Sequence, residues 1–135
     1  MKLFINPSYI SELIILAKDA YPSEACALLF GDLKESIINV KQIVPLINAD
    51  NSAVSFRIND NDLFHAYRMS ETNGLSTIGI YHSHPFGSNF PSQTDREYMI
   101  CNSVPWIIYS ISEGNMRCFI LNEKEEIEEI EIVSQ

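Results

Sequence analysis

The chain has 135 residues, 46% of them hydrophobic, and a formal net charge of −9 from 18 acidic and 9 basic residues. A chain of this length and composition can bury one core without disulfides or a structural metal, so we expect a single domain over residues 1–135. The acidic balance argues against nucleic acid or an anionic membrane as the main partner, because both surfaces repel an acidic protein.

Three cysteines, Cys26, Cys101 and Cys118, are widely separated among apolar residues. An odd number of cysteines in such surroundings indicates reduced thiols buried in the core, and hence a cytoplasmic protein. The apolar run before Pro7 is too short for a signal peptide. No apolar stretch approaches the roughly 20 residues that a membrane span requires.

Periodicity and turn residues predict alternating helices and strands. Asn6 can cap a helix with Pro7 at its first position, and Pro22 ends that helix. Glu24 then stands at the head of an almost wholly apolar strand. In chain order we expect a helix over 7–20, a hairpin of strands over 23–31 and 37–44 closing at Pro45, a loop over 48–55 and a short edge strand over 55–58. A second helix is capped by Asn59 or Asp60, contains Met69 and is stopped by Asn73-Gly74. A buried strand leading to His82 and His84, a helix over 92–101, and strands over 104–111, 116–121 and 127–133 complete the chain.

The segment 123–131 is rich in glutamate. We interpret it as a solvated edge strand that discourages the addition of another strand. An acidic surface that faces a partner is the alternative.

The stretch 76–95 begins as an apolar strand and ends as a polar loop. Successive side chains of an extended segment point to opposite faces, so His82 and His84 share one face and can converge on one ion. Asp95 adds a carboxylate. Two histidines and one carboxylate form a suitable ligand set for a catalytic zinc that keeps a fourth position for water.

Two further residues can supply the chemistry that such a zinc requires. Bound zinc lowers the pKa of water to roughly 7, but a carboxylate must still move the proton. Glu24 can take that proton and later give it to the leaving amine, and Ser92 can donate a hydrogen bond to the oxyanion. Cys26 has no adjacent basic partner and is not expected to be a nucleophile.

Each of these residues, taken singly, also has a structural explanation. Ser92 and Asp95 have the spacing of a helix cap with an acid in the first turn. A lone histidine at a strand end is commonly a surface residue, and His65 on its helix belongs to that class. Glu24 alone is equally compatible with a surface charge at a strand end.

Together, His82-x-His84-x7-Ser92-x2-Asp95 and the upstream Glu24 resemble the JAMM motif of the MPN-plus (JAB domain) metalloproteases, in their short bacterial single-domain form. The resemblance implies an α+β fold, with a curved mixed β-sheet flanked by helices in a layered architecture like that of cytidine deaminases. It implies one Zn²⁺ held by His82, His84 and Asp95 with a water as fourth ligand, Glu24 as general base and acid, and Ser92 as the oxyanion donor. Family members commonly have glycine where this chain has Ala27.

The resemblance also implies a reaction, the cleavage of a peptide or isopeptide bond after the C-terminal tail of a ubiquitin-like or sulfur-carrier protein. Such a tail would lie extended along a sheet edge. Only 40 residues follow Asp95, which leaves little room for the insertions that eukaryotic deubiquitinases use to grip ubiquitin chains, so a small carrier is favoured.

Other functions are also compatible with parts of the sequence. A non-catalytic MPN-type scaffold is one alternative, although such domains lack the ligand set, and a phage-tail-associated peptidase is another. A zinc nucleoside deaminase is excluded because the chain has no Pro-Cys-x-x-Cys segment. The sequence leaves open the substrate protein and whether the chain forms a homodimer.

Overall fold

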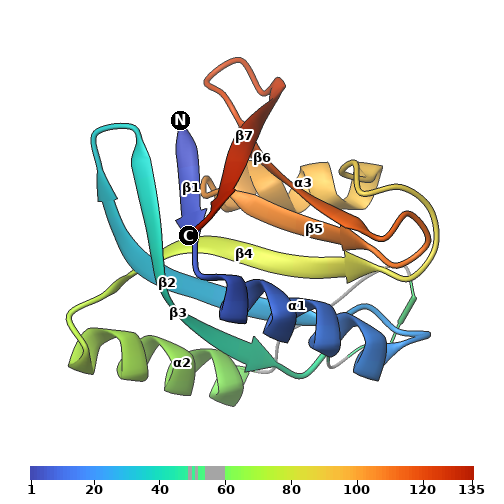
Figure 1. The fold of residues 1–135 in the computed structure, drawn as a ribbon, viewed down its shortest axis with the longest axis horizontal. Helices are drawn as coiled ribbons and strands as arrows, with labels where there is room; N and C mark the ends of the chain where they lie inside the picture. Colours follow the sequence, from blue (N-terminus) through green and yellow to red (C-terminus); the bar gives the residue numbers. More distant parts are fainter. Residues whose placement is uncertain (49, 51, 54–59) are drawn as a thin grey trace.

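The computed structural model describes residues 1–48, 50, 52–53 and 60–135. Within these ranges, seven strands form one mixed sheet that packs against three helices (Figure 1). The elements are β1 (Lys2–Ile5), α1 (Pro7–Ala20), β2 (Cys26–Lys34), β3 (Ile37–Leu46), α2 (Asp60–Thr72), β4 (Ser76–His84), α3 (Gln93–Cys101), β5 (Trp106–Ser110), β6 (Asn115–Leu121) and β7 (Ile127–Ser134).

The sheet has the strand order β1-β3-β2-β4-β5-β6-β7 and closes into a barrel. The predicted hairpin of β2 and β3 is antiparallel, and β2 also pairs antiparallel with β4. Closure comes from β1, which pairs in parallel with β3 on one side and with β7 on the other. The expected α+β fold with a curved mixed sheet is therefore confirmed.

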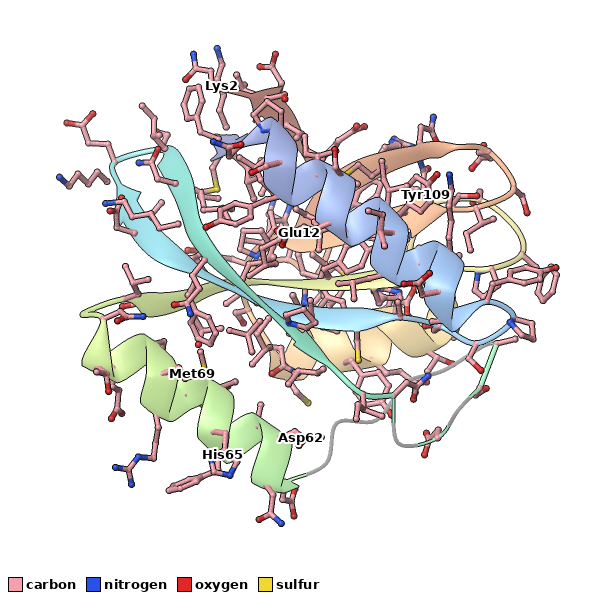
Figure 2. The ribbon with its side chains drawn as sticks, turned by 60° about the horizontal axis from the view of Figure 1, so that its bottom comes forward. Lys2, Glu12, Asp62, His65, Met69 and Tyr109 are labelled. Carbon is pink, nitrogen blue, oxygen red and sulfur yellow. The ribbon has the colours of Figure 1, made fainter. Side chains whose placement is uncertain are left out.

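Two hydrophobic clusters lie on the two faces of this sheet, because neighbouring side chains of a strand point in opposite directions. In β2, Ala27 and Leu29 belong to the cluster that includes Leu13 and Ala17 of α1. Cys26, Leu28 and Phe30 belong to the other cluster, with Ala66 of α2 and Met99 of α3. Figure 2 shows α1 and α2 on opposite sides of the β2–β3–β4 ribbon. The helices thus flank both faces, as a layered architecture requires.

β1 is a strand that the sequence analysis did not predict. Its four residues are too few to show a clear alternation, yet Leu3 and Ile5 are almost completely buried in the core.

β1 also changes the interpretation of the acidic segment 123–131. Its glutamates are exposed, but β7 pairs with β6 and with β1, so the expected edge strand is wrong. These glutamates are exposed because their side chains point out of the barrel, not because β7 lies at a sheet edge.

Three smaller expectations also need correction. Cys101 is exposed at the end of α3, so only Cys26 and Cys118 are the buried thiols expected. β2 begins at Cys26 rather than Ser23, and β3 continues through Pro45, which pairs with Ala27. Proline is tolerated there because β1 pairs with β3 only as far as Asn39 and needs no N–H from position 45. The expected edge strand over 55–58 and the cap at Asn59 lie outside the described residues.

Among the described residues, no helix has the length and apolar character needed to cross a membrane.

Candidate metal centre

Both histidines lie at the end of β4, where it leaves the core. His82 pairs with Cys26 of β2 and with Ile108 of β5, so it sits between two neighbouring strands. His82 is completely buried and His84 is 8% exposed. The centroids of their rings are 4.9 Å apart, which agrees with the expectation that the two side chains share one face of the strand.

The metal-ligating atoms of three residues converge at this point. Nε2 of His82 lies 3.1 Å from Nε2 of His84 and 3.1 Å from Oδ1 of Asp95. Nε2 of His84 lies 3.0 Å from Oδ2 of Asp95. Within the described part of the chain, these are the three residues whose ligand atoms all lie within 4.8 Å of one another. The structure therefore brings together the predicted ligand set, which comes from β4 and α3.

Asp95 is held in place by the N-terminus of α3. Ser92 is the N-cap, its Oγ accepts a hydrogen bond from the Asp95 N–H, and the Asp95 carboxylate accepts one from the Ser92 N–H. This reciprocal capping box fixes the aspartate rotamer before any ligand binds. The cap and the proposed ligand role of Asp95 are thus compatible in one geometry.

A backbone contact orients His84. Its Nδ1 lies 2.6 Å from the carbonyl oxygen of Ser88, and since a carbonyl only accepts, Nδ1 carries the hydrogen. In the neutral ring, Nε2 is then a lone pair that faces another imidazole nitrogen and a carboxylate oxygen. A neutral His82 can donate a hydrogen from its Nε2, but the contact between Nε2 of His84 and Oδ2 of Asp95 then still joins two lone pairs. A cation at the centre would satisfy all of these atoms. The donor set therefore fits a divalent metal with nitrogen and oxygen ligands, such as zinc.

The protonation tendencies of the three residues follow from burial and their mutual contacts. Burial opposes the charged form of Asp95, but hydrogen bonds to His82 and His84 lower its pKa well below the usual range. Burial lowers the pKa of His82. Burial also opposes the charged form of His84, but hydrogen bonds to Asp95 and to the Ser88 carbonyl raise its pKa. The ligand set thus contains one firmly ionised carboxylate.

Glu24 lies two residues before β2. Because β2 runs antiparallel to β4, the start of β2 lies beside the end of β4. The Glu24 side chain is only 3% exposed, and Oε1 has no hydrogen-bond partner in the described structure. Burial raises the pKa of Glu24 to about 8. The charge of His84 lowers this pKa, and the charge of Asp95 raises it further. A buried carboxyl with an unused oxygen, within electrostatic range of the ligand set, is the arrangement expected of a proton shuttle.

Three further positions that the sequence analysis discussed are Cys26, His65 and Ala27. Cys26 is buried, and burial, together with the charge of Glu24, raises its pKa to about 12, which disfavours a nucleophilic thiolate. His65 is exposed on α2 and points away from the sheet (Figure 2). Ala27 is fully buried between β3 and β4, opposite Pro45 and Tyr81.

Residues that support the site were missed by sequence reasoning. Ser88 acts through its backbone, and Asn89, 3% exposed, donates its N–H to Glu113 and its side-chain amide to Asn115. No spacing in the sequence reveals such contacts between distant loops. Ser83 was recoverable, because alternation places the residue between two ligand histidines on the opposite face of the strand.

The fold is an α+β domain, and the cluster is a buried group of residues that could hold a metal ion. The sequence profile of the prokaryotic homologs of the JAB domain matches residues 6–122. A desampylase from Pyrococcus furiosus is 32% identical over 129 residues, which cover 96% of this chain and 89% of that protein. The chain belongs to the family of prokaryotic homologs of the JAB domain.

Further relatives match over shorter stretches. The CysO-cysteine peptidase of Mycobacterium tuberculosis is 28% identical over 93 residues, 69% of this chain and 62% of the peptidase. A probable TtuB-protein conjugate cleaving protease of Thermus thermophilus is 35% identical over 89 residues, 65% of this chain and 58% of the protease. The matches thus span about three fifths of these two longer proteins.

Solved structures support the same fold. A Desulfitobacterium hafniense protein superposes with a TM-score of 0.89 at 26% identity, covering 98% of this chain and 92% of its own. A JAB1/MPN domain protein from Archaeoglobus fulgidus superposes with a TM-score of 0.59 at 25% identity, covering 99% and 100%.

Proposed function

We propose that this chain, a JAMM-type peptidase or isopeptidase, uses one zinc ion to cleave the bond that follows the C-terminal tail of a ubiquitin-like or sulfur-carrier protein. The observation that carries the proposal is the buried Glu24 carboxyl beside the His82–His84–Asp95 cluster. The substrate class is supported by relatives that are named for CysO-cysteine and for TtuB conjugates. A cytoplasmic location is compatible with such substrates.

His82, His84 and Asp95 would hold the zinc. When bound there, zinc supplies a Lewis acid that polarises a carbonyl and makes water easier to deprotonate. Glu24 accepts the proton of the attacking water at its buried carboxylate and delivers it to the leaving amine. Burial raises the pKa of Glu24 to about 8 in the absence of the metal, and a bound cation would lower it, which favours the carboxylate that accepts the proton.

Ser92 would stabilise the oxyanion. Its Oγ acts as the acceptor of the Asp95 N–H in the capping box, which leaves the hydroxyl hydrogen for a bond to the substrate. The residue is exposed at the N-terminus of α3, where a developing negative charge also meets the favourable end of the helix dipole. Binding and orientation of the scissile carbonyl would thus fall to the start of α3.

The proposal is tested with a small β-grasp carrier that ends in Gly-Gly and is extended by one cysteine, and with an isopeptide conjugate of the same carrier. Cleavage is followed by mass spectrometry in the zinc-loaded wild type and in Glu24→Gln. We expect Glu24→Gln to lose at least about 1,000-fold in kcat, because the proton shuttle is gone, while zinc affinity stays within a few-fold of wild type.

Glu12→Gln is the matched control, because Glu12 is an exposed glutamate on α1 (Figure 2). It should cleave like wild type. Undiminished turnover in Glu24→Gln would remove Glu24 from the mechanism. Failure of the purified protein to take up zinc would instead favour an MPN-type scaffold.

A further inference from the structure

Ser83, between the two histidines, forms a buried connection to the segment that carries Glu24. Its side chain points to the face opposite His82 and His84 and is completely buried. Oγ of Ser83 accepts a hydrogen bond of 2.8 Å from the N–H of Ala25, and the Ser83 N–H donates one of 3.0 Å to the Ala25 carbonyl. Both polar groups of the Ala25 backbone are thus bonded to the residue between the ligands.

The connection lies where regular strand pairing stops. β2 and β4 pair from Cys26 opposite His82, and Ala25 precedes the first residue of β2. The hydroxyl of Ser83 therefore continues the hydrogen bonding between β2 and β4 past the start of β2, to Ala25. A methyl group in its place would leave the Ala25 N–H buried without that acceptor.

Glu24 is held from the other side by the segment that follows β3. Its N–H donates a hydrogen bond of 2.6 Å to the Ser52 carbonyl, and its carbonyl accepts one of 3.1 Å from the side-chain amide of Asn48. The same amide lies 3.4 Å from the Ser52 carbonyl. The backbone of Glu24 and Ala25 is thus bonded on both sides, whereas Oε1 of the Glu24 side chain has no partner in the described structure.

We propose that Ser83 and Asn48 are positioning residues that clamp the Glu24–Ala25 backbone from two sides and keep the Glu24 carboxylate facing the metal ligands. The physical reason is that the carboxylate cannot be fixed by its own hydrogen bonds, since it must remain available to exchange a proton. Its place is therefore set by the backbone. The proposal rests on the proposed function only for its effect on turnover.

The variants are Ser83→Ala and Asn48→Ala, with Ser83→Thr as the conservative variant that keeps the hydroxyl. Ser70→Ala is the matched control, because Ser70 is also buried and donates to the Tyr67 carbonyl within α2. With the extended carrier as substrate, we expect Ser83→Ala to lower kcat about 10- to 100-fold with KM within about threefold, since a small misplacement of a catalytic group has effects of this size. Zinc affinity should stay within about threefold, and Ser83→Thr should restore most of kcat.

Two measurements without substrate keep the clamp testable if no carrier is cleaved. In metal-free Ser83→Ala, the Ala25 amide should exchange with solvent about tenfold faster, as loss of one hydrogen bond predicts. The carboxyl carbon resonance of Glu24 should shift in Ser83→Ala and in Asn48→Ala, and stay unchanged in Ser70→Ala. A wild type that cleaves nothing would refute the proposed function while these shifts still supported the clamp. Unchanged Ala25 exchange and an unchanged Glu24 resonance in Ser83→Ala would overturn it, as would a loss of zinc affinity as large as the loss of kcat.

Discussion

The hydroxyl of Ser110 donates a hydrogen bond of 2.6 Å to the carbonyl of Gly87. Gly87 directly precedes Ser88, whose carbonyl fixes the ring of His84. Ser110 is completely buried at the end of β5, and its Oγ also accepts the N–H of Glu113. The Ser110 side chain therefore connects the loop after β4 to the β5–β6 turn and, through that loop, helps to orient His84, a proposed metal ligand.

Ser110→Ala should weaken zinc binding about tenfold, because residues that orient metal ligands from behind typically contribute 10- to 100-fold to affinity. Competition with a chromophoric chelator measures the dissociation constant. Ser70→Ala, a buried serine far from this loop in sequence, is the control and should bind zinc like wild type. Equal affinity in both variants would mean that the loop holds His84 without Ser110.

Removal of the metal should lower thermal stability. The His82, His84 and Asp95 ligand atoms are brought together only in the folded chain, so a ligand at 100 times its Kd adds about 2.7 kcal/mol to the folded state. For a domain of this size we expect zinc to raise Tm by about 10 °C over the chelator-treated protein. Calorimetry with and without zinc measures the shift.

Asp95→Asn is the informative variant for that experiment, because asparagine keeps an oxygen for the Ser92 N–H and so retains the helix cap. It should fold, but its Tm should respond little to zinc. Asp19→Asn, at an exposed position of α1, should respond like wild type. A full zinc response in Asp95→Asn would place the metal elsewhere.

The stability of the metal-free protein should depend on pH through Glu24. Burial raises its pKa to about 8 in the folded chain from 4.5 for an unperturbed glutamate, so between these pH values the folded state binds more protons than the unfolded state. The contribution of Glu24 to stability is therefore full below about pH 4.5 and is lost as the pH rises through 8. The loss should amount to about 2–4 kcal/mol.

Denaturant unfolding of wild type and Glu24→Gln at pH 5 and pH 8.5 isolates this effect, since glutamine cannot ionise. The stability of Glu24→Gln relative to wild type should increase by the stated amount at the higher pH. A difference that does not change with pH would show that the carboxyl is more solvated than its 3% exposure indicates.

The three thiols should differ in reactivity. Burial raises the pKa values of Cys26 and Cys118 to about 12, whereas Cys101 is exposed. The thiolate is the reactive form, so a disulfide reagent should label Cys101 within minutes and the other two only after unfolding. Cys101→Ser should remove the rapid reaction. Rapid labelling that persists in this variant would indicate opening of β2 or β6.

The sequence alone predicted most of the elements, because apolar periodicity and turn residues are local properties of the chain. α1 begins with the expected cap at Asn6 and Pro7, and α3 with the expected cap at Ser92. β1 was missed because four residues carry too little pattern, and its burial depends on partners in β3 and β7. The exposure of Cys101 was missed because the end of a short helix can face either the sheet or the solvent.

For the metal centre, the sequence determined which residue types were present and that His82 and His84 would share a face, since alternation along a strand is fixed by backbone geometry. Only the tertiary structure decided that Asp95 and Glu24 reach the same point. The start of α3 lies at the end of β4, where Asp95 contacts His84, and antiparallel pairing brings the start of β2 beside the same end of β4. The contacts that hold the site, from Ser83 to Ala25 and from Ser110 to Gly87, join segments far apart in sequence. No local pattern encodes such hydrogen bonds, since they form only when β2, β4 and β5 lie side by side in the folded chain.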